Sequence, residues 1–175
     1  MSRVSTLAQG SLAILAALLM LPTAAHATGT RYFHSSLCHG ITASGGASTN
    51  AILNQFGQFE ITATSGTTTA VCPLILDPTV SEIPTGSSVV VNAYENGGTS
   101  SFSAFALAVC RAPAAGGNPV CGGQTFVSGT PGSVSLTVSL PSVNVGDYLY
   151  VLMIIGPHTS TGGDNAVFGY KLVNP

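Results

Sequence analysis

The sequence predicts an all-β fold: a single antiparallel β-sandwich of two sheets, of jelly-roll or immunoglobulin-like type, with about eight or nine strands. Three observations lead to this prediction. Apolar residues alternate with polar ones in short runs, and Gly, Pro, Asn or Ser bound each run. No segment beyond residue 27 has the 3.6-residue period of an amphipathic helix. The chain has no Trp, so the immunoglobulin version lacks the tryptophan that packs in the core of antibody domains.

The first 27 residues have the pattern of a signal peptide. Arg3 supplies the positive start, residues 12–21 form an apolar run, and Ala25-His26-Ala27 matches an A-x-A cleavage site. The apolar run is about half of the roughly 20 residues that a membrane-spanning helix needs, so we expect no membrane span. We therefore expect a secreted or periplasmic protein, in which residues 28–175 form one disulfide-stapled domain.

Eight runs after the cleavage site have the length and alternation of strands. They cover residues 56–64, 67–75, 88–95, 101–110, 124–128, 133–140, 147–155 and 165–173. A ninth strand is expected at residues 32–37 or at residues 40–43.

Three local features refine this pattern. Pro73 lacks a backbone N–H, so its strand is expected to lie at an edge or to end early. Asn96-Gly97-Gly98 predicts a hairpin turn after residues 88–95. Residues 147–155 are apolar on both faces, which is typical of a strand that is covered on both sides.

The four cysteines predict two structural disulfides, because paired cysteines are the rule in small exported domains. Three pairings are open to four cysteines. Cys110 and Cys121 flank a Gly- and Pro-rich loop and are expected to staple its base, which leaves Cys38 for Cys72. Each bridge stabilises the fold by about 3–4 kcal/mol in the chain-entropy model. The spacing includes no C-x-x-C motif, which argues against a metal or redox role.

Three short motifs resemble a group of uncharacterised small secreted proteins of Gram-negative bacteria. The motifs are Ser36-Leu37-Cys38-His39, Val71-Cys72-Pro73 and Gly169-Tyr170. The resemblance implies a β-sandwich and brings no known activity. That group usually has a further cysteine in the penultimate strand, which residues 150–154 lack. The resemblance therefore makes Cys121 the substitute partner of Cys110.

Charged side chains are rare. The chain has four Lys and Arg and six Asp and Glu, and its formal net charge is −2 at pH 7. Loss of Arg3 with the leader makes the charge 3 − 6 = −3. This composition excludes a nucleic-acid binder that works by neutralising phosphates. Low charge also weakens repulsion between copies, so self-association is permitted.

Candidate catalytic and metal-binding residues are few. Cys38 and His39 are neighbours and point apart in an extended chain, so they do not form a nucleophile–base pair. The chain has no G-x-S-x-G elbow, P-loop or dinucleotide fingerprint. We therefore predict no catalytic residue, metal site or cofactor. The groups considered and set aside are His34, His39 and His158 for zinc, Asp77, Asp164 and Asn165 for calcium, and the few carboxylates for glycosidase chemistry.

The tyrosines are the remaining candidates for ligand binding. Tyr148 and Tyr150 share one face of a predicted strand, and Tyr170 joins them if the last two strands pair. One interpretation is core packing with the hydroxyl groups near the rim. The other is an aromatic patch for a glycan or another partner.

Three functions remain open at this stage. The first is an exported non-catalytic structural or surface protein that self-associates, which the low charge and the absence of a convergent polar site favour. The alternative is an extracellular carbohydrate- or ligand-binding module, which the tyrosines favour. A hydrolase with an unrecognised site has only the scattered carboxylates and histidines in its support.

Overall fold

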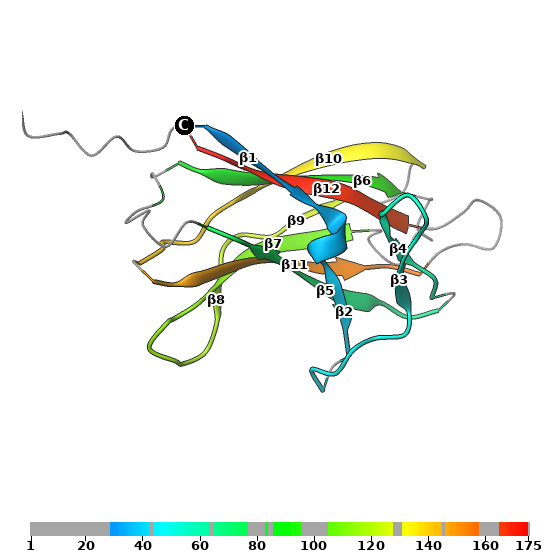
Figure 1. The fold of residues 1–175 in the computed structure, drawn as a ribbon, viewed down its shortest axis with the longest axis horizontal. Coiled ribbons are helices and arrows are strands. Elements are labelled where there is room, and N and C mark those ends of the chain that lie inside the picture. Colours follow the sequence, from blue (N-terminus) through cyan, green and yellow to red (C-terminus); the bar gives the residue numbers. More distant parts are fainter. Residues whose placement is uncertain are drawn as a thin grey trace, which may run out of the picture.

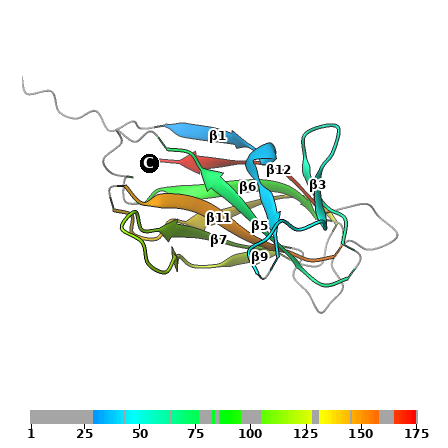
Figure 2. The same cartoon turned by 60° about the horizontal axis from the view of Figure 1, so that its bottom comes forward.

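The computed structural model describes residues 29–42, 44–63, 65–76, 83, 86–95, 105–127, 131–144, 146–157 and 165–174. Two antiparallel sheets pack face to face, as Figures 1 and 2 show. This arrangement confirms the predicted β-sandwich. The signal peptide falls outside the described residues, and so do the candidate ligands His158, Asp77 and Asp164.

Six strands form the first sheet, which we call sheet A. Its order is β10-β6-β12-β4-β3, and β1 also pairs with β12. The strands are β1 (Thr30–His34), β3 (Ala51–Leu53), β4 (Phe59–Ile61), β6 (Ser88–Glu95), β10 (Gly132–Ser139) and β12 (Asn165–Val173).

Six further strands form sheet B. Its order is β2-β5-β11-β7-β8, and β9 also pairs with β7. A short 3-10 helix, η1 (Ser35–Leu37), leads from β1 in sheet A to β2 in sheet B. The strands are β2 (His39–Ile41), β5 (Thr68–Leu74), β7 (Phe105–Ala112), β8 (Val120–Cys121), β9 (Thr125–Val127) and β11 (Tyr148–Ile155).

The long strands lie where the alternation predicts them, but one predicted connection is wrong. The Asn-Gly-Gly segment was expected to join two paired strands, yet β6 belongs to sheet A and β7 to sheet B. In sheet A, β6 pairs with β10 on one side and β12 on the other, which leaves it no free edge for β7. The Asn-Gly-Gly motif therefore indicates a change of chain direction only. Which strands pair is determined by β10 and β12, which occupy both edges of β6.

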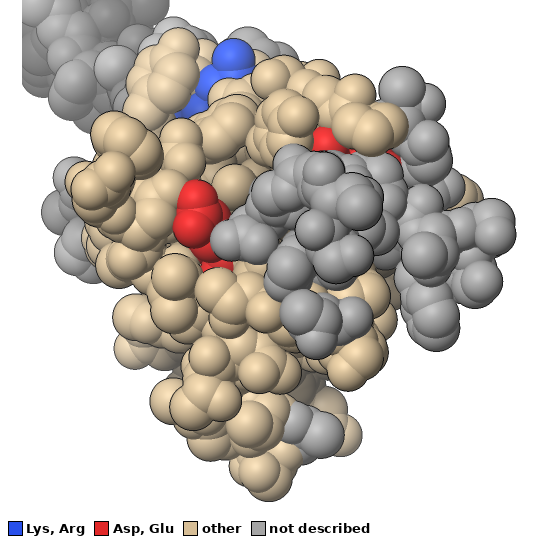
Figure 3. Space-filling view, turned by 90° about the vertical axis from the view of Figure 1, so that its right-hand side faces the viewer, with Lys and Arg blue, Asp and Glu red and all other residues tan. Residues whose placement is uncertain are grey.

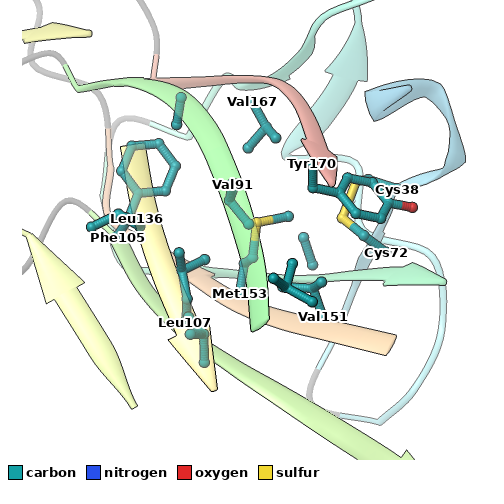
Figure 4. Packing of buried hydrophobic residues seen from close by; sticks show 14 of the residues in the cluster. Cys38, Cys72, Val91, Phe105, Leu107, Leu136, Val151, Met153, Val167 and Tyr170 are labelled. Atoms are coloured by element: carbon teal, nitrogen blue, oxygen red, sulfur yellow. A yellow bond between two sulfur atoms is a disulfide. The ribbon is translucent and has the colours of Figure 1, made fainter. Parts of the chain in front are cut away.

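The core fills the space between the sheets, and Figure 4 shows its packing. Val91 from sheet A and Met153 from sheet B are 0–1% exposed. Tyr170 reaches across the layers, where its ring stacks on Phe33 with centroids 5.2 Å apart. Its hydroxyl donates a hydrogen bond of 2.6 Å to the backbone oxygen of Pro73, so a strand of sheet A is tied to a strand of sheet B.

Both predicted disulfides are present, and they lie in different surroundings. Cys38 is bonded to Cys72, in the core beside Tyr170 (Figure 4). Cys110 is bonded to Cys121 across the antiparallel pair β7–β8. The two bridges confirm the pairing expected from the sequence.

Pro73 lies at a local edge, as its missing N–H predicts. The partner strand β2 pairs only with Thr69 to Val71 of β5. Beyond Val71, β5 is itself the edge of sheet B, so the missing N–H of Pro73 leaves no second neighbouring strand without a donor.

The two sides of the sandwich are closed differently. On one side, the Thr125 hydroxyl of β9 donates a hydrogen bond of 3.1 Å to the backbone oxygen of Thr137 on β10. On the other side, the chain itself crosses from sheet B to sheet A between β2 and β3. Gly40 makes that crossing possible, because a Cβ built at this position lies 2.8 Å from the Ala51 Cβ.

Candidate ligand-binding face

The outer face of sheet A is polar along its edge strand and mixed further in, where Val90 and Tyr94 of β6 alternate with the core residues. Its edge strand β10 alternates strictly, with buried Leu136 and Val138 facing inward and exposed serines and Thr137 facing outward. The Ser135 side chain on this face is hydrogen-bonded at 2.7 Å to Asn92 of β6. Tyr32 of β1 is 77% exposed, and the Lys171 ammonium lies 5.9 Å from its ring centre. The β10 side of this face therefore has the composition of an ordinary solvated surface.

The outer face of sheet B is apolar instead. Its central strand β11 turns Leu149, Val151, Met153 and Ile155 into the core. The intervening residues point outward, and all four are large: Tyr148, Tyr150, Leu152 and Ile154. The sequence predicted a strand covered on both sides, but Tyr148 is 71% and Ile154 is 37% exposed. The outward side of β11 is therefore accessible, and its apolar composition needs another explanation than core packing.

Tyr148 and Tyr150 lie on the same face, as the alternation predicted. Tyr148 pairs with Ala112 of β7, while Tyr150 lies between Pro73 of β5 and Cys110 of β7. Partial burial raises the pKa of the Tyr150 hydroxyl above its usual value near 10, so this group stays protonated as a hydrogen-bond donor.

Tyr170 does not join this pair, which corrects the third candidate of the sequence analysis. It lies on β12, which pairs with β6, β4 and β1 of sheet A and not with β11. Its ring is 2% exposed. Burial raises the pKa of its hydroxyl well above the usual range. Tyr170 thus packs in the core and offers nothing to a ligand on the outer face of sheet B.

No Lys, Arg, Asp or Glu lies on the described part of this outer face, and the exposed imidazole of His39, which pairs with Val71, lies on it at β2. On β7, Arg111 alternates with the outward residues, and its guanidinium contacts the Asp147 carboxylate at 2.8 Å. The Asn144 N–H donates to the same carboxylate at 3.0 Å. The hydrogen bond from the Asn144 backbone lowers the pKa of Asp147 the most, and the hydrogen bond from Arg111 lowers it further. Figure 3 shows that charged side chains are also sparse at the end of the sandwich, on the right in Figure 1.

A hollow of about 210 Å³ lies at the side of the sandwich where the chain changes sheet. Cys38 and Phe59 line its buried part, and Ile52 and Leu53 line it near the solvent, where they are about half exposed. Polar and apolar groups share its wall, and His39 and Ser48 are the polar residues among those that line it. It is separate from the tyrosines, because no residue of β7 or β11 lines it.

His34 has a structural role. The His34 ring caps η1 by accepting a hydrogen bond of 3.2 Å from the Ser36 N–H, and it lies against Gly57, whose positive φ of 73° a β-hairpin turn requires. The Asn165 amide donates to the backbone oxygen of Gly156 at 3.1 Å.

In the described ranges, no three His, Cys, Asp or Glu residues gather as a metal site would require. No helix in those ranges is long and apolar enough to cross a membrane.

Sequence reasoning did not identify two contributors to the face, namely β8 and Phe126 of β9. Phe126 is 69% exposed and pairs with Ala106 of β7. The alternation in residues 124–128 predicts a strand, but it does not show with which strand this short segment pairs. The pairing with β7 alone places Phe126 on the same face as the tyrosines.

No protein-family model and no curated protein matches the chain. Among solved structures, it is similar to a low-affinity xylan-binding module, CBM86, from Roseburia intestinalis. The sequence identity is 14%, the match covers 84% of this chain and 96% of that chain, and the TM-score is 0.47. It is also similar to a family 11 carbohydrate-binding module from Clostridium thermocellum, solved in complex with a β-1,3-1,4-mixed-linked tetrasaccharide. Here the sequence identity is 9%, the match covers 85% of this chain and 97% of that chain, and the TM-score is 0.47. With identities and TM-scores this low, the likeness carries no argument about the ligand of this chain.

Proposed function

We propose that this protein is an exported, non-catalytic carbohydrate-binding protein whose ligand lies against the outer face of sheet B. The observation that carries the proposal is the tyrosine pair of β11. Tyr148 and Tyr150 stand side by side on one face, and the described part of that face has no charged side chain. Sugar rings expose C–H groups that pack on aromatic faces, while the phenol hydroxyls supply hydrogen bonds at the ring edges.

Export is supported by two independent features. The first 27 residues have the charge, apolar run and cleavage pattern of a leader. All four cysteines are joined in disulfides, and such bonds persist in oxidising compartments such as the periplasm or the extracellular space. A protein placed there meets cell-surface and environmental polysaccharides.

A structural, self-associating role is the second candidate, and one observation favours it. Leu152 and Ile154 continue the row of Tyr148 and Tyr150 as aliphatic residues. Exposed aliphatic residues gathered on one face are typical of protein interfaces. Oligomeric state in solution separates this role from glycan binding.

The decisive experiment measures retention on neutral and acidic polysaccharides, using protein produced with its own leader in an exporting host. We expect retention on a neutral polysaccharide, and we expect Tyr148→Ala and Tyr150→Ala to weaken it by roughly tenfold each, because each removes one aromatic contact. Tyr32→Ala is the matched control, since Tyr32 is equally exposed but lies on sheet A.

Light scattering after size exclusion runs alongside the retention assay. A monomer that binds glycan through Tyr148 supports the proposal. Equal losses in the Tyr32 and Tyr148 variants contradict it. Failure to retain any polysaccharide, together with an oligomer that Ile154→Ser dissociates, establishes the structural role instead.

A further inference from the structure

The hairpin formed by β3 and β4 is a well-built element at one edge of sheet A. Its turn is organised by Asn54, whose side-chain oxygen accepts hydrogen bonds of 2.9 and 3.0 Å from the N–H groups of Phe56 and Gln58. Gly57 closes the turn with a positive φ of 73° and donates to the Asn54 backbone oxygen at 2.9 Å. Figure 2 shows this hairpin projecting from the body of the sandwich. The ordered turn therefore holds the Phe56 ring, which is 73% exposed, in the solvent.

The outer edge of β3 is open to a further strand, because β4 is its only neighbour in sheet A. The backbone hydrogen bond from Asn54 to Gln58, at 3.0 Å, fixes which residues of β3 face β4. Hydrogen-bonded pairs alternate along an antiparallel ladder, so Ile52 turns its N–H and C=O toward β4. Ala51 and Leu53 turn theirs toward the open edge. No backbone hydrogen bond in the described part of the chain reaches those outward groups.

Two other sheet edges are occupied by the chain itself. At β2, the Ser48 N–H donates a hydrogen bond of 2.9 Å to the Gly40 backbone oxygen. At β10, the Thr125 hydroxyl occupies the backbone oxygen of Thr137. In the described ranges β3 has no comparable cover, and its sequence Ala-Ile-Leu has neither a charge nor a proline to repel another strand. The open edge of β3 is therefore available for strand addition.

The side chains at this edge are apolar and exposed. Ile52 is 46% and Leu53 is 48% exposed, beside Phe56 at the turn. The hollow of about 210 Å³ lies next to β3, and all three residues of the strand line it. Leu53 and Ala51 are two residues apart and so lie on the same side of the strand, one large and one small. The edge thus combines unpaired backbone groups, a large apolar side chain and a recess.

We infer that the open edge of β3 pairs antiparallel with β3 of a second copy around a two-fold axis, so that the two copies of sheet A become one continuous sheet. The register that uses every outward group places Ile52 opposite Ile52 of the second copy, and Leu53 opposite Ala51. Ala51 and Leu53 of the two copies then exchange four backbone hydrogen bonds. Each Leu53 meets a small Ala51 at the hollow of the other copy. The same edge supplies both halves of the contact, as a two-fold interface requires.

Charge does not oppose this pairing. The charged residue of the hairpin is Glu60 of β4, which pairs with Ile52 and accepts a hydrogen bond from the Asn54 side chain. In the paired sheets, Glu60 and Glu60 of the second copy are three strand spacings apart, which is about 14 Å. Their repulsion is largely screened, because the Debye length at physiological salt is about 8 Å.

The size of the contact sets its strength. The exposed parts of Ile52, Leu53 and Phe56 amount to roughly 300 Å² per copy. A standard stable interface takes about 800 Å² from each partner. The dimer is therefore weak, forms at high protein concentration and separates on dilution. It is independent of the glycan site, because β3 belongs to sheet A and the tyrosine pair to sheet B.

Cross-linking of the exported protein tests the register. Ile52→Cys places two thiols across the two-fold axis, where the Cα atoms of a non-hydrogen-bonded pair lie about 4.5 Å apart, within the reach of a disulfide. We expect a disulfide-linked dimer on a non-reducing gel. Phe56→Cys is the matched control on the same hairpin, since Phe56 is more exposed but lies more than about 20 Å from its counterpart in this register. We expect it to give at least roughly tenfold less linked dimer.

Sedimentation equilibrium from about 1 to 500 μM measures the association itself. We expect the average mass of the native sequence to rise from one chain toward two. Leu53→Lys is expected to weaken association by at least roughly tenfold, because a lysine at an edge strand opposes pairing. Ser135→Lys adds the same charge to β10 of the same sheet and is expected to leave association unchanged. Thermal melting checks that both variants are folded.

Four outcomes overturn the inference. The first is a single-chain mass at every concentration, and the second is equal cross-linking of the two cysteine variants. The third is an assembly that Ile154→Ser dissociates and Leu53→Lys does not, which assigns the contact to the outer face of sheet B. The fourth is a mass that grows beyond two copies, which contradicts a closed two-fold pairing. None of these outcomes bears on polysaccharide retention through Tyr148, so the two proposals fail separately.

Discussion

The two outer faces of this sandwich come from strands with the same in–out alternation, yet they carry different side chains. On sheet A, the outward positions of β10 are three serines and one threonine. On sheet B, the outward positions of β11 are two tyrosines, a leucine and an isoleucine. Both strands turn their other side toward the core, so packing of the core does not require this difference. Outward side chains contribute little to the packing of the core. Their chemistry therefore reflects what each outer face contacts.

The largest effect is expected from the two disulfides, one inside the sandwich and one on the outer face of sheet B. Replacing Cys38 and Cys72 by alanine is expected to lower the free energy of unfolding by about 4 kcal/mol, and replacing Cys110 and Cys121 by about 3 kcal/mol. Denaturant unfolding measures both. Only the second pair lies on the same side of sheet B as Tyr150, so only its loss should also reduce polysaccharide affinity under native conditions. Equal losses of affinity contradict a glycan site on the outer face of sheet B.

Met153 and Leu152 are neighbours on β11 that point to opposite sides. Met153→Ala empties a fully buried site and is expected to cost about 2–5 kcal/mol of unfolding free energy. Leu152→Ala is expected to cost less than about 1 kcal/mol, because its side chain points out of the core. Urea titration of the two variants checks this contrast. A similar cost at both positions implies that the outer side of β11 is covered as well.

Introducing a charge compares the two outer faces directly. Leu152→Lys places an ammonium in the outward row of β11, beside Tyr150, and is expected to lower polysaccharide affinity by at least roughly tenfold. Ser135→Lys adds the same charge to the exposed face of sheet A and is expected to leave affinity unchanged. Calorimetric titration of the two variants checks the prediction. An equal loss in both indicates a general effect of charge rather than a site on sheet B.

The ion pair between Arg111 and Asp147 links β7 to the turn before β11. The folded-state pKa of Asp147 is lowered, so its contribution to stability is complete above the usual aspartate pKa of 3.8 and is lost as pH falls through the lower folded value. Asp147→Asn is expected to remove part of this acid-dependent stability. Thermal melts of both proteins between about pH 2 and pH 6 test this. Parallel melting curves for the two proteins contradict the prediction.

The smallest effect is expected from pH and salt on binding itself. Because burial raises the pKa of Tyr150, its hydroxyl stays protonated, and affinity for a neutral oligosaccharide is expected to change less than about twofold between about pH 7 and pH 9. Raising the salt concentration from about 0.05 to 1 M is expected to have as little effect. Affinity that falls steeply with salt indicates a charged ligand.

The sequence was sufficient for local decisions and insufficient for long-range ones. Alternation along β11 placed Tyr148 and Tyr150 on one face, since that depends only on neighbouring residues. The position of Tyr170 depends on whether β12 pairs with β11 or β6, and nothing local to the last strand decides this. Phe126 was missed for the same reason, because its short strand acquires a face only through pairing with β7. Sheet membership is set by the total burial of all strands, which no single run of residues encodes.

The hydrogen bond from Thr125 to Thr137 has a consequence for how copies of the chain avoid one another. β10 is an edge strand of eight residues without charge or proline, a composition that invites another chain to extend the sheet and begin a fibril. The hydroxyl of Thr125 occupies a backbone oxygen in the middle of that strand. A single side chain from the opposite sheet thus occupies one of the backbone oxygens that a further strand would need in order to extend sheet A at β10.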